Sequence, residues 1–200
     1  MKRIYDNWQD KLPAGKSGSH LYEEFELRAR NVATEVFRVR TFVEARGIIA
    51  NLAELVNAEK AVVANGPLQQ AAGIVRALKS AGVAVYSKPG ELREHVATAD
   101  MGISSVEFGI AETGSVCQNA YAIEDRLVSS LPPIHVALLN SNNIVPGIDD
   151  ALDVVSESFD RGYMSFITGP SRTADIERVL TIGVHGPIRF IVVAVDEEVA

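Results

Sequence analysis

The stretch KAVVANGPLQQAAGIVRALKSAGVAVY, residues 60–86, predicts the fold class of this protein. It begins with a short apolar run, Lys60–Ala64, which is typical of a buried strand. Pro67 then marks a helix start, and a helix is expected over Leu68–Ser80. The second apolar run, Val83–Tyr86, predicts another strand. A strand, a helix and a strand in this order form the unit from which parallel sheets are built.

The same alternation continues on both sides of this stretch. Strands are expected at Thr34–Val39, His135–Leu139, Met164–Thr168 and Ile188–Val195, and helices at 42–57, Asp149–Phe159 and Arg172–Ile182. Residues 34–39 also fit a continued helix, but Thr41 and Glu44 form a capping box that predicts a new helix start and a break before it. The pattern therefore predicts an α/β fold, a mostly parallel sheet with helices on both faces.

Three regions are expected from the local composition. Residues 1–18 are polar and rich in Pro, Gly and Ser, which predicts a flexible N-terminal arm. Residues 19–200 are expected to form a single α/β domain. Within it, residues 98–132 break the alternation and predict a hairpin or loop insertion at one end of the sheet. Ligands of open α/β sheets bind beyond the carboxyl ends of the strands, where irregular segments often carry function.

Composition excludes several classes of protein. The chain has 200 residues, of which 47% are hydrophobic and 22% charged, as in ordinary globular domains. Its net charge is −7, with +1 on residues 1–60 and −8 on residues 61–200. An acidic body argues against nucleic-acid binding. An anion site must then be local, built from backbone N–H groups or one or two arginines.

The apolar runs and the cysteine and histidine content indicate the localisation and the metal-binding capacity of the chain. The apolar runs are too short to span a bilayer, and residues 1–12 contain no apolar signal core, so we expect a cytoplasmic protein. The single cysteine, Cys117, suits a reducing compartment and is too few for an iron–sulfur cluster, which needs about four thiolates. The four histidines show no short metal-ligand spacing, so no metal site is predicted.

The turn at residues 168–171 is the first candidate site. Here a predicted strand ends, Gly and Pro form a tight turn, and a predicted helix begins, which would place free N–H groups and hydroxyls around an anion. The alternative is ordinary turn and helix-cap chemistry. The residues assigned to this site are Thr168, Gly169, Pro170, Ser171, Thr173 and Asp175.

A second candidate is the segment Ile110–Ser115. Thr113 and Gly114 predict a hairpin turn between two apolar stretches, and Glu112 lies beside it. A partly buried Glu112 would serve as a base or nucleophile, with Thr113, Gly114 and Ser115 contacting the ligand. Alternatively, Glu112 is a solvent-facing residue at a hairpin tip.

Three further residues are candidates for ligand contacts. Arg126 can clamp a carboxylate through two parallel hydrogen bonds, or pair with its acidic neighbours on the surface. His135 opens a predicted strand and His185 lies in a Gly- and Pro-framed turn, so packing and turn formation are the alternatives for both. The sequence contains no GxGxxG after a strand, no Walker A sequence, no GxSxG and no HExxH.

Taken together, these segments resemble the family of lactate utilisation protein C (LutC/YkgG), which has a LUD domain. The similarity is close over residues 98–195, looser over 25–90 and absent from 1–18. It is carried by Ala99-Asp100, Gly102-Ile103, Ile110–Ser115, Arg126, Ser130–Pro132, His135, Ile144-Val145, Thr168–Glu177 and Gly183–Pro187.

The resemblance implies a Rossmann-like three-layer fold similar to the phosphosugar isomerase and CoA-transferase (NagB/RpiA-like) superfamily. It also implies a cytoplasmic role in oxidising L-lactate to pyruvate, together with iron–sulfur proteins as partners. This chain would be the member without clusters, and no cofactor is expected on it alone. The single cysteine agrees with this expectation.

Three hypotheses follow. In the first, the chain is a non-redox subunit or accessory protein that binds a small carboxylate or phosphate at Ser171, Thr173 and Arg126, with Glu112 nearby. In the second, it is a stand-alone transferase or isomerase acting on an acyl-CoA or sugar phosphate. Glu112 is then nucleophile or base, and residues 168–171 hold the phosphate. In the third, it is a regulatory or scaffolding module without a ligand.

Overall fold

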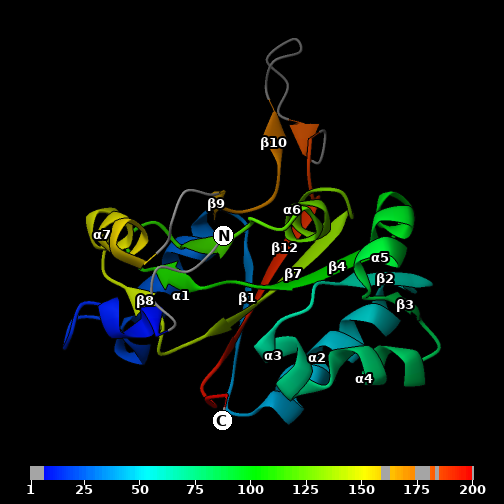
Figure 1. Cartoon of the computed structure of the whole chain (residues 1–200), viewed down its shortest axis with the longest axis horizontal. Coiled ribbons are helices and arrows are strands. Elements are labelled where there is room, and N and C mark those ends of the chain that lie inside the picture. Colours follow the sequence, from blue (N-terminus) through cyan, green and yellow to red (C-terminus); the bar gives the residue numbers. More distant parts are fainter. Residues whose placement is uncertain (1–6, 159–162, 174–180, 183–184, 200) are drawn as a thin grey trace.

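The computed structural model describes residues 7–158, 163–173, 181–182 and 185–199 (Figure 1). Six parallel strands form the main sheet, in the order β1-β12-β7-β4-β2-β3. They are β1 (Glu35–Val39), β2 (Lys60–Val63), β3 (Ala84–Tyr86), β4 (Met101–Ser105), β7 (Ile134–Asn140) and β12 (Arg189–Val195). The predicted α/β class and parallel sheet are confirmed.

Helices cover both faces of this sheet. On one face, α2 (Phe42–Leu55), α3 (Pro67–Ala72) and α4 (Ile74–Ser80) pack against side chains of β7 and β12 such as Val136 and Val193. On the other, α1 (Tyr22–Asn31), which follows the short turn η2 (Ser19–Leu21), packs against alternate residues such as Ala137 and Val192. Because both faces are buried, these strands read as continuous apolar runs.

Local signals placed the helices on the first face well. Thr41 caps α2 as predicted, since its hydroxyl accepts a hydrogen bond from the Glu44 N–H at 3.2 Å. The Glu44 carboxylate accepts from the N–H of Arg40, one residue before the cap, at 2.8 Å. The single helix expected over Leu68–Ser80 is instead two helices, because Gly73 adopts a left-handed conformation with φ of 63° and breaks it.

A second, four-stranded sheet lies on the α1 side, in the order β8-β5-β6-β9. Its strands are β5 (Phe108–Ile110), β6 (Ser115–Asn119), β8 (Ile144–Val145) and β9 (Met164–Ile167). The antiparallel pair β5 and β6 confirms the predicted hairpin. The strand expected at residues 164–168 is present, but it pairs antiparallel with β6 and so belongs to this sheet.

Residues 98–132 as a whole are not an insertion, contrary to the prediction. They follow α5 (Pro89–His95) and the turn η3 (Val96–Thr98), and they begin with β4, which lies between β7 and β2 in the main sheet. The helix α6 (Ile123–Ser130) packs so closely on β4 that a Cβ atom at Gly102 would overlap the Val128 carbonyl. The small residue that this contact requires weakens the strand signal of Met101–Ser105.

The helix expected over Arg172–Ile182 is wrong at both described ends. Arg172–Thr173 forms β10 and Thr181–Ile182 forms β11, and these two pair antiparallel. Figure 1 shows β10 extending away from the body of the molecule. Local helix signals are a weak guide at these two ends, because tertiary context overrides helix propensity and the ends pair with each other.

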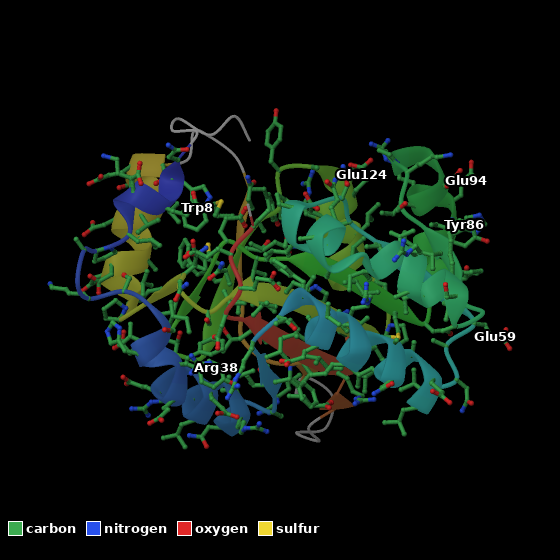
Figure 2. All side chains as sticks on the ribbon, turned by 90° about the horizontal axis from the view of Figure 1, so that it is seen from below. Trp8, Arg38, Glu59, Tyr86, Glu94 and Glu124 are labelled. Carbon is green, nitrogen blue, oxygen red and sulfur yellow. The ribbon has the colours of Figure 1, made fainter. Side chains whose placement is uncertain are left out.

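The prediction of a flexible arm over residues 1–18 fails from residue 7 onward. The turn η1 (Trp8–Lys11) packs against α7 (Ile148–Ser158) (Figure 2). Only 2% of Trp8 is exposed. The Trp8 ring lies 6.0 Å from that of Phe108, measured between centroids. One buried indole holds a polar segment in place, since it removes a large apolar area from water. Residues 1–6 lie outside the described residues.

We expect Trp8→Ala to lower the free energy of unfolding by about 3 kcal/mol or more, because it removes a buried aromatic side chain. Gln9→Ala, at the exposed neighbour in the same turn, is the control and should stay within about 0.5 kcal/mol of the parent. Urea denaturation followed by far-ultraviolet circular dichroism measures both. An unchanged stability of Trp8→Ala would show that η1 is not docked in solution.

Candidate functional site

The two predicted motifs, residues 112–115 and 168–171, come together in space. The pairing of β6 with β9 places Val116 opposite Ile167. Consequently the hydroxyls of Ser115 and Thr168 lie 2.7 Å apart and share a hydrogen bond. The Thr113 hydroxyl accepts from the N–H of Ser115 at 3.3 Å. The first two hypotheses grouped these motifs in one site, and the strand pairing is the contact that makes them neighbours.

Two glycines in these motifs seat α1. Gly114 and Gly169 have positive φ angles of 66° and 76°. A Cβ atom at Gly114 would overlap the backbone of Ala29, and one at Gly169 would overlap the carbonyl of Val32. Pro170, the next residue, is buried. The motifs therefore form a tight contact with the end of α1, which leaves no room for a ligand at these two glycines.

The turn at 168–171 also lies at the wrong edge of the main sheet for the predicted anion site. The Ser171 N–H donates to the Pro187 carbonyl at 2.9 Å, just before β12 begins. The turn therefore lies at the amino end of β12, on the opposite side of the main sheet from the carboxyl edge. No helix begins at Ser171; β10 follows. The strand–turn–helix interpretation is therefore wrong on two points, the position of the turn relative to the sheet and the helix expected after it.

The remaining predicted ligand residues belong to other segments or lie outside the described residues. Thr173 belongs to β10, Asp175 lies outside the described residues, and His185 is exposed ahead of β12. The guanidinium of Arg126, in α6, lies over the Tyr163 ring at 4.9 Å from its centroid, a cation–π contact. A ligand role for these residues stays a prediction.

Glu112 is exposed, not partly buried as the base or nucleophile hypothesis expected. Its Oε2 atom accepts a hydrogen bond from the N–H of Ile148, the first residue of α7, at 3.1 Å. A carboxylate at this position satisfies a free helix N–H and opposes the positive end of the helix dipole. The geometry thus gives Glu112 a capping contact with α7.

His135 is completely buried within a polar cluster that the sequence did not predict. Its Nε2 atom lies 2.8 Å from the Ser104 hydroxyl, which also accepts from the Gln118 side-chain amide at 3.1 Å. These residues come from β7, β4 and β6, so the cluster joins the two sheets. Polar residues inside the apolar runs of β4 and β6 were the only sequence signal.

The protonation of His135 follows from this cluster. When the Ser104 hydroxyl accepts from Gln118 and donates to His135, Nε2 of His135 is the acceptor and Nδ1 carries the hydrogen. In the other tautomer Nε2 would donate to Ser104, and the hydroxyl hydrogen of Ser104 would have no acceptor in the cluster. Burial lowers the pKa of His135 to about 3. A neutral, enclosed imidazole does not exchange protons with a substrate near neutral pH, so packing explains His135 better than acid–base chemistry.

Two cavities lie at the carboxyl edge of the main sheet. Along the chain, β2 is followed outward by β3, and the chain then returns to β4, β7 and β12 on the other side of β2. The strand order thus reverses between β2 and β4, the position at which open α/β sheets bind ligands. Two cavities of opposite character border it.

The first, which we call the acidic cavity, measures about 370 Å³ and lies beyond the ends of β4 and β7. Its lining includes Glu107, Asn140, Asn143 and Glu198. The Glu107 carboxylate accepts from the Asn119 N–H at 2.6 Å, and Glu198 accepts from the side chain of Asn142 at 3.1 Å. Two carboxylates make this cavity unfavourable for an anion.

The second, which we call the basic cavity, measures about 630 Å³ and lies beyond the ends of β2 and β3. Arg76 and Lys79, both exposed on α4, supply its charge, and neither is paired with a carboxylate in the described part of the chain. The full lining is Val63, Ala64, Asn65, Gln69, Gln70, Gly73, Val75, Arg76, Lys79, Ser80 and Ser87. The sequence predicted residues 68–80 only as a helix. It could not predict the cavity, because residues that follow β2 and β3 complete its lining.

Comparison with known proteins identifies the family. Residues 22–195 match the model of the LUD domain. The chain belongs to the LUD domain family. This LUD domain is 33% identical over 156 residues to lactate utilization protein C of Halalkalibacterium halodurans, covering 74% of the chain and 68% of the relative. It is 31% identical over 138 residues to that of Anoxybacillus flavithermus, covering 68% of the chain and 63% of the relative.

Other matches to the LUD domain are partial or concern the fold alone. The similarity to lactate utilization protein C 1 of Bacillus mycoides is 35% over 105 residues, which is 50% of this chain and 45% of that protein. The chain thus spans about half to two thirds of the relatives' length. The crystal structure of a DUF162 family protein from Deinococcus radiodurans superposes with a TM-score of 0.67 at 21% identity, covering 92% of this chain and 99% of that one.

No helix in the described residues is long and apolar enough to cross a membrane. The described residues also contain no group of three His, Cys, Asp or Glu side chains arranged to hold a metal ion.

We expect Glu112→Ala to destabilise the LUD domain by about 1 kcal/mol, because the first N–H of α7 loses its acceptor. Glu112→Gln keeps an oxygen in place and should be close to the parent. Glu94→Gln, at an exposed position of α5, is the surface control (Figure 2). Thermal and urea denaturation measure these effects. Full stability of Glu112→Gln combined with loss of the protein's activity would instead support the catalytic hypothesis.

The buried His135 makes stability depend on pH. The unfolded chain binds a proton at His135 below its ordinary pKa of about 6.5, while the folded chain binds it only near pH 3. Stability should therefore fall by up to about 1.4 kcal/mol for each pH unit as the pH drops through this window. Carboxylates contribute to the same slope, so the direct measurement is the imidazole NMR signal. A midpoint near pH 6.5 in the folded protein would contradict the buried cluster.

Proposed function

We propose that this chain is a non-redox subunit or accessory protein of a cytoplasmic system that oxidises L-lactate to pyruvate. The relatives named lactate utilization protein C support a role in lactate utilisation. Oxidation of lactate releases two electrons and two protons, which need an acceptor. The single thiol, Cys117, is buried in β6, and burial raises its pKa, so it is a poor ligand or nucleophile. Iron–sulfur proteins as partners would accept the electrons.

The same cysteine content motivates the proposed compartment. One buried, unpaired thiol is typical of proteins in a reducing environment. We therefore place the system in the cytoplasm. A NagB/RpiA-like relationship of the fold remains part of this proposal, supported by the parallel sheet and its covering layers.

The observation that carries the proposal is the basic cavity. In a body of net charge −8 over residues 61–200, two cations that have no carboxylate partner among the described residues border a cavity at the carboxyl edge of the sheet. Arg76 can hold a carboxylate or phosphate with two parallel hydrogen bonds, and Lys79 adds a second positive charge. We assign the anionic ligand to this cavity, in place of the turn at residues 168–171.

The alternative function is a stand-alone transferase or isomerase acting on an acyl-CoA or sugar phosphate. The two cations of the basic cavity suit a phosphate as well as a carboxylate, which favours keeping this candidate. It differs from the first in needing no partner, so purification of the native assembly distinguishes them.

We expect a tagged chain, purified gently from its host grown on lactate, to retain Cys-rich, iron-containing proteins in fixed proportion. The isolated chain should oxidise no lactate. Arg76→Ala with Lys79→Ala should lower lactate-dependent activity of the assembly at least about tenfold, since each removes a charge-assisted contact. Arg28→Ala, an exposed residue of α1, is the control. Lactate turnover by the isolated chain would overturn the proposal, as would an iron-free eluate with full activity.

A further inference from the structure

The basic cavity is much larger than the acids of the lactate reaction. Its volume of about 630 Å³ falls within the range of roughly 300–1,000 Å³ that is typical of sites for larger organic ligands. Lactate and pyruvate are three-carbon acids and would contact only a small part of its lining. The size therefore points to a ligand with an additional body beyond its anionic group.

Part of the lining is apolar and would hold such a body. Val75 of α4 is half-buried and exposes hydrocarbon surface to the cavity. Val63 and Ala64, at the end of β2, are almost fully buried and form an apolar floor without side-chain hydrogen-bonding groups. A planar, weakly polar ring gains free energy by covering such surface, whereas a sugar would lose hydration of its hydroxyls there.

Amide side chains add directional hydrogen bonding to this surface. The Gln70 side-chain N–H donates to the Asn65 side-chain oxygen at 2.7 Å. This bond orients both amides and leaves an N–H of Asn65 and the side-chain oxygen of Gln70 without another side-chain partner in the described residues. These two exposed amides thus offer both a donor and an acceptor, which are the groups needed to bind the edge of a nitrogen heterocycle.

The charges match a phosphate monoester better than one carboxylate. Arg76 and Lys79 are three residues apart on α4, and side chains at this spacing lie on the same side of a helix. Together they supply two positive charges, and a phosphate monoester carries about −1.5 to −2 at neutral pH. A lactate carboxylate would balance only one of them.

We propose that the basic cavity binds a mononucleotide-like ligand, a phosphate monoester joined to a heteroaromatic ring. Arg76 and Lys79 hold the phosphate, Val63, Ala64 and Val75 support the ring, and Asn65 and Gln70 contact its edge. This inference rests on the proposed function only for the position of the anion site.

Calorimetric titration of the purified full chain tests the ligand class. The probes are AMP, ribose 5-phosphate, inorganic phosphate and L-lactate, each at up to millimolar concentration. We expect AMP to bind most tightly, ribose 5-phosphate more weakly and phosphate weakest, and AMP to raise the melting temperature most. Equal binding of ribose 5-phosphate and AMP, or no binding of AMP, would overturn the proposal.

Substitutions locate the site. Arg76→Gln and Lys79→Gln should each weaken AMP binding about tenfold, because each loses a charge-assisted hydrogen bond. Both positions are exposed, so the circular dichroism spectra should not change. Arg28→Gln, on α1, is the matched control and should bind like the parent. AMP binding that survives both cavity substitutions, or falls equally in the control, would contradict the assignment.

The outcomes separate the two proposals. Lactate binding that depends on Arg76, without AMP binding, would overturn the mononucleotide inference and leave the proposed function standing. AMP binding that depends on Arg76, in a chain that retains no iron-containing partner from its host, would support the inference and overturn the proposed function.

Discussion

The central strands β7 and β12 must be covered on both faces, and the other layers of the molecule meet this requirement. Their alternate side chains enter two different apolar cores, one shared with α2 to α4 and the other with α1 and the second sheet. A parallel sheet exposed on either side would leave continuous apolar rows in water. The first face is covered by helices that follow their strands directly. The second face is covered by α1 and by the second sheet, whose strands come from separated segments of the chain.

Close backbone contact makes that second covering possible. Gly102 lets α6 approach β4, while Gly114 and Gly169 let two turns approach α1. The Ser104, His135 and Gln118 cluster then connects the sheets through buried hydrogen bonds. Two of the sequence blocks that carry the family resemblance, around residues 110–115 and 168–171, thus have a clear structural task. A motif that identifies a family need not be the part that contacts its ligand.

The distribution of charge at the carboxyl edge of the main sheet is more informative about function than these sequence motifs are. The acidic cavity and the basic cavity flank the same reversal of strand order but would select opposite charges. In an acidic body, Arg76 and Lys79, which pair with no carboxylate in the part of the chain that the structure describes, form a local attraction for anions. The charge of the rest of the molecule limits nonspecific binding of polyanions. Such a chain can choose one small anion without becoming a general binder of nucleic acid.

The sequence by itself determined the α/β class, the positions of β1, β2, β7 and β12, the hairpin around Gly114 and the capped start of α2. Each depends on periodicity, caps or turn residues within a few positions of one another, and these act locally. Only the tertiary structure decided that β9 joins β6, that β4 lies inside the main sheet, and that residues 168–171 border its amino edge. The tertiary structure alone brought Glu112 to the first N–H of α7 and assembled the basic cavity beside Arg76. An apolar strand carries little information about which distant strand it will pair with, so partner choice, and with it the placement of the candidate site, depends on how the whole chain packs.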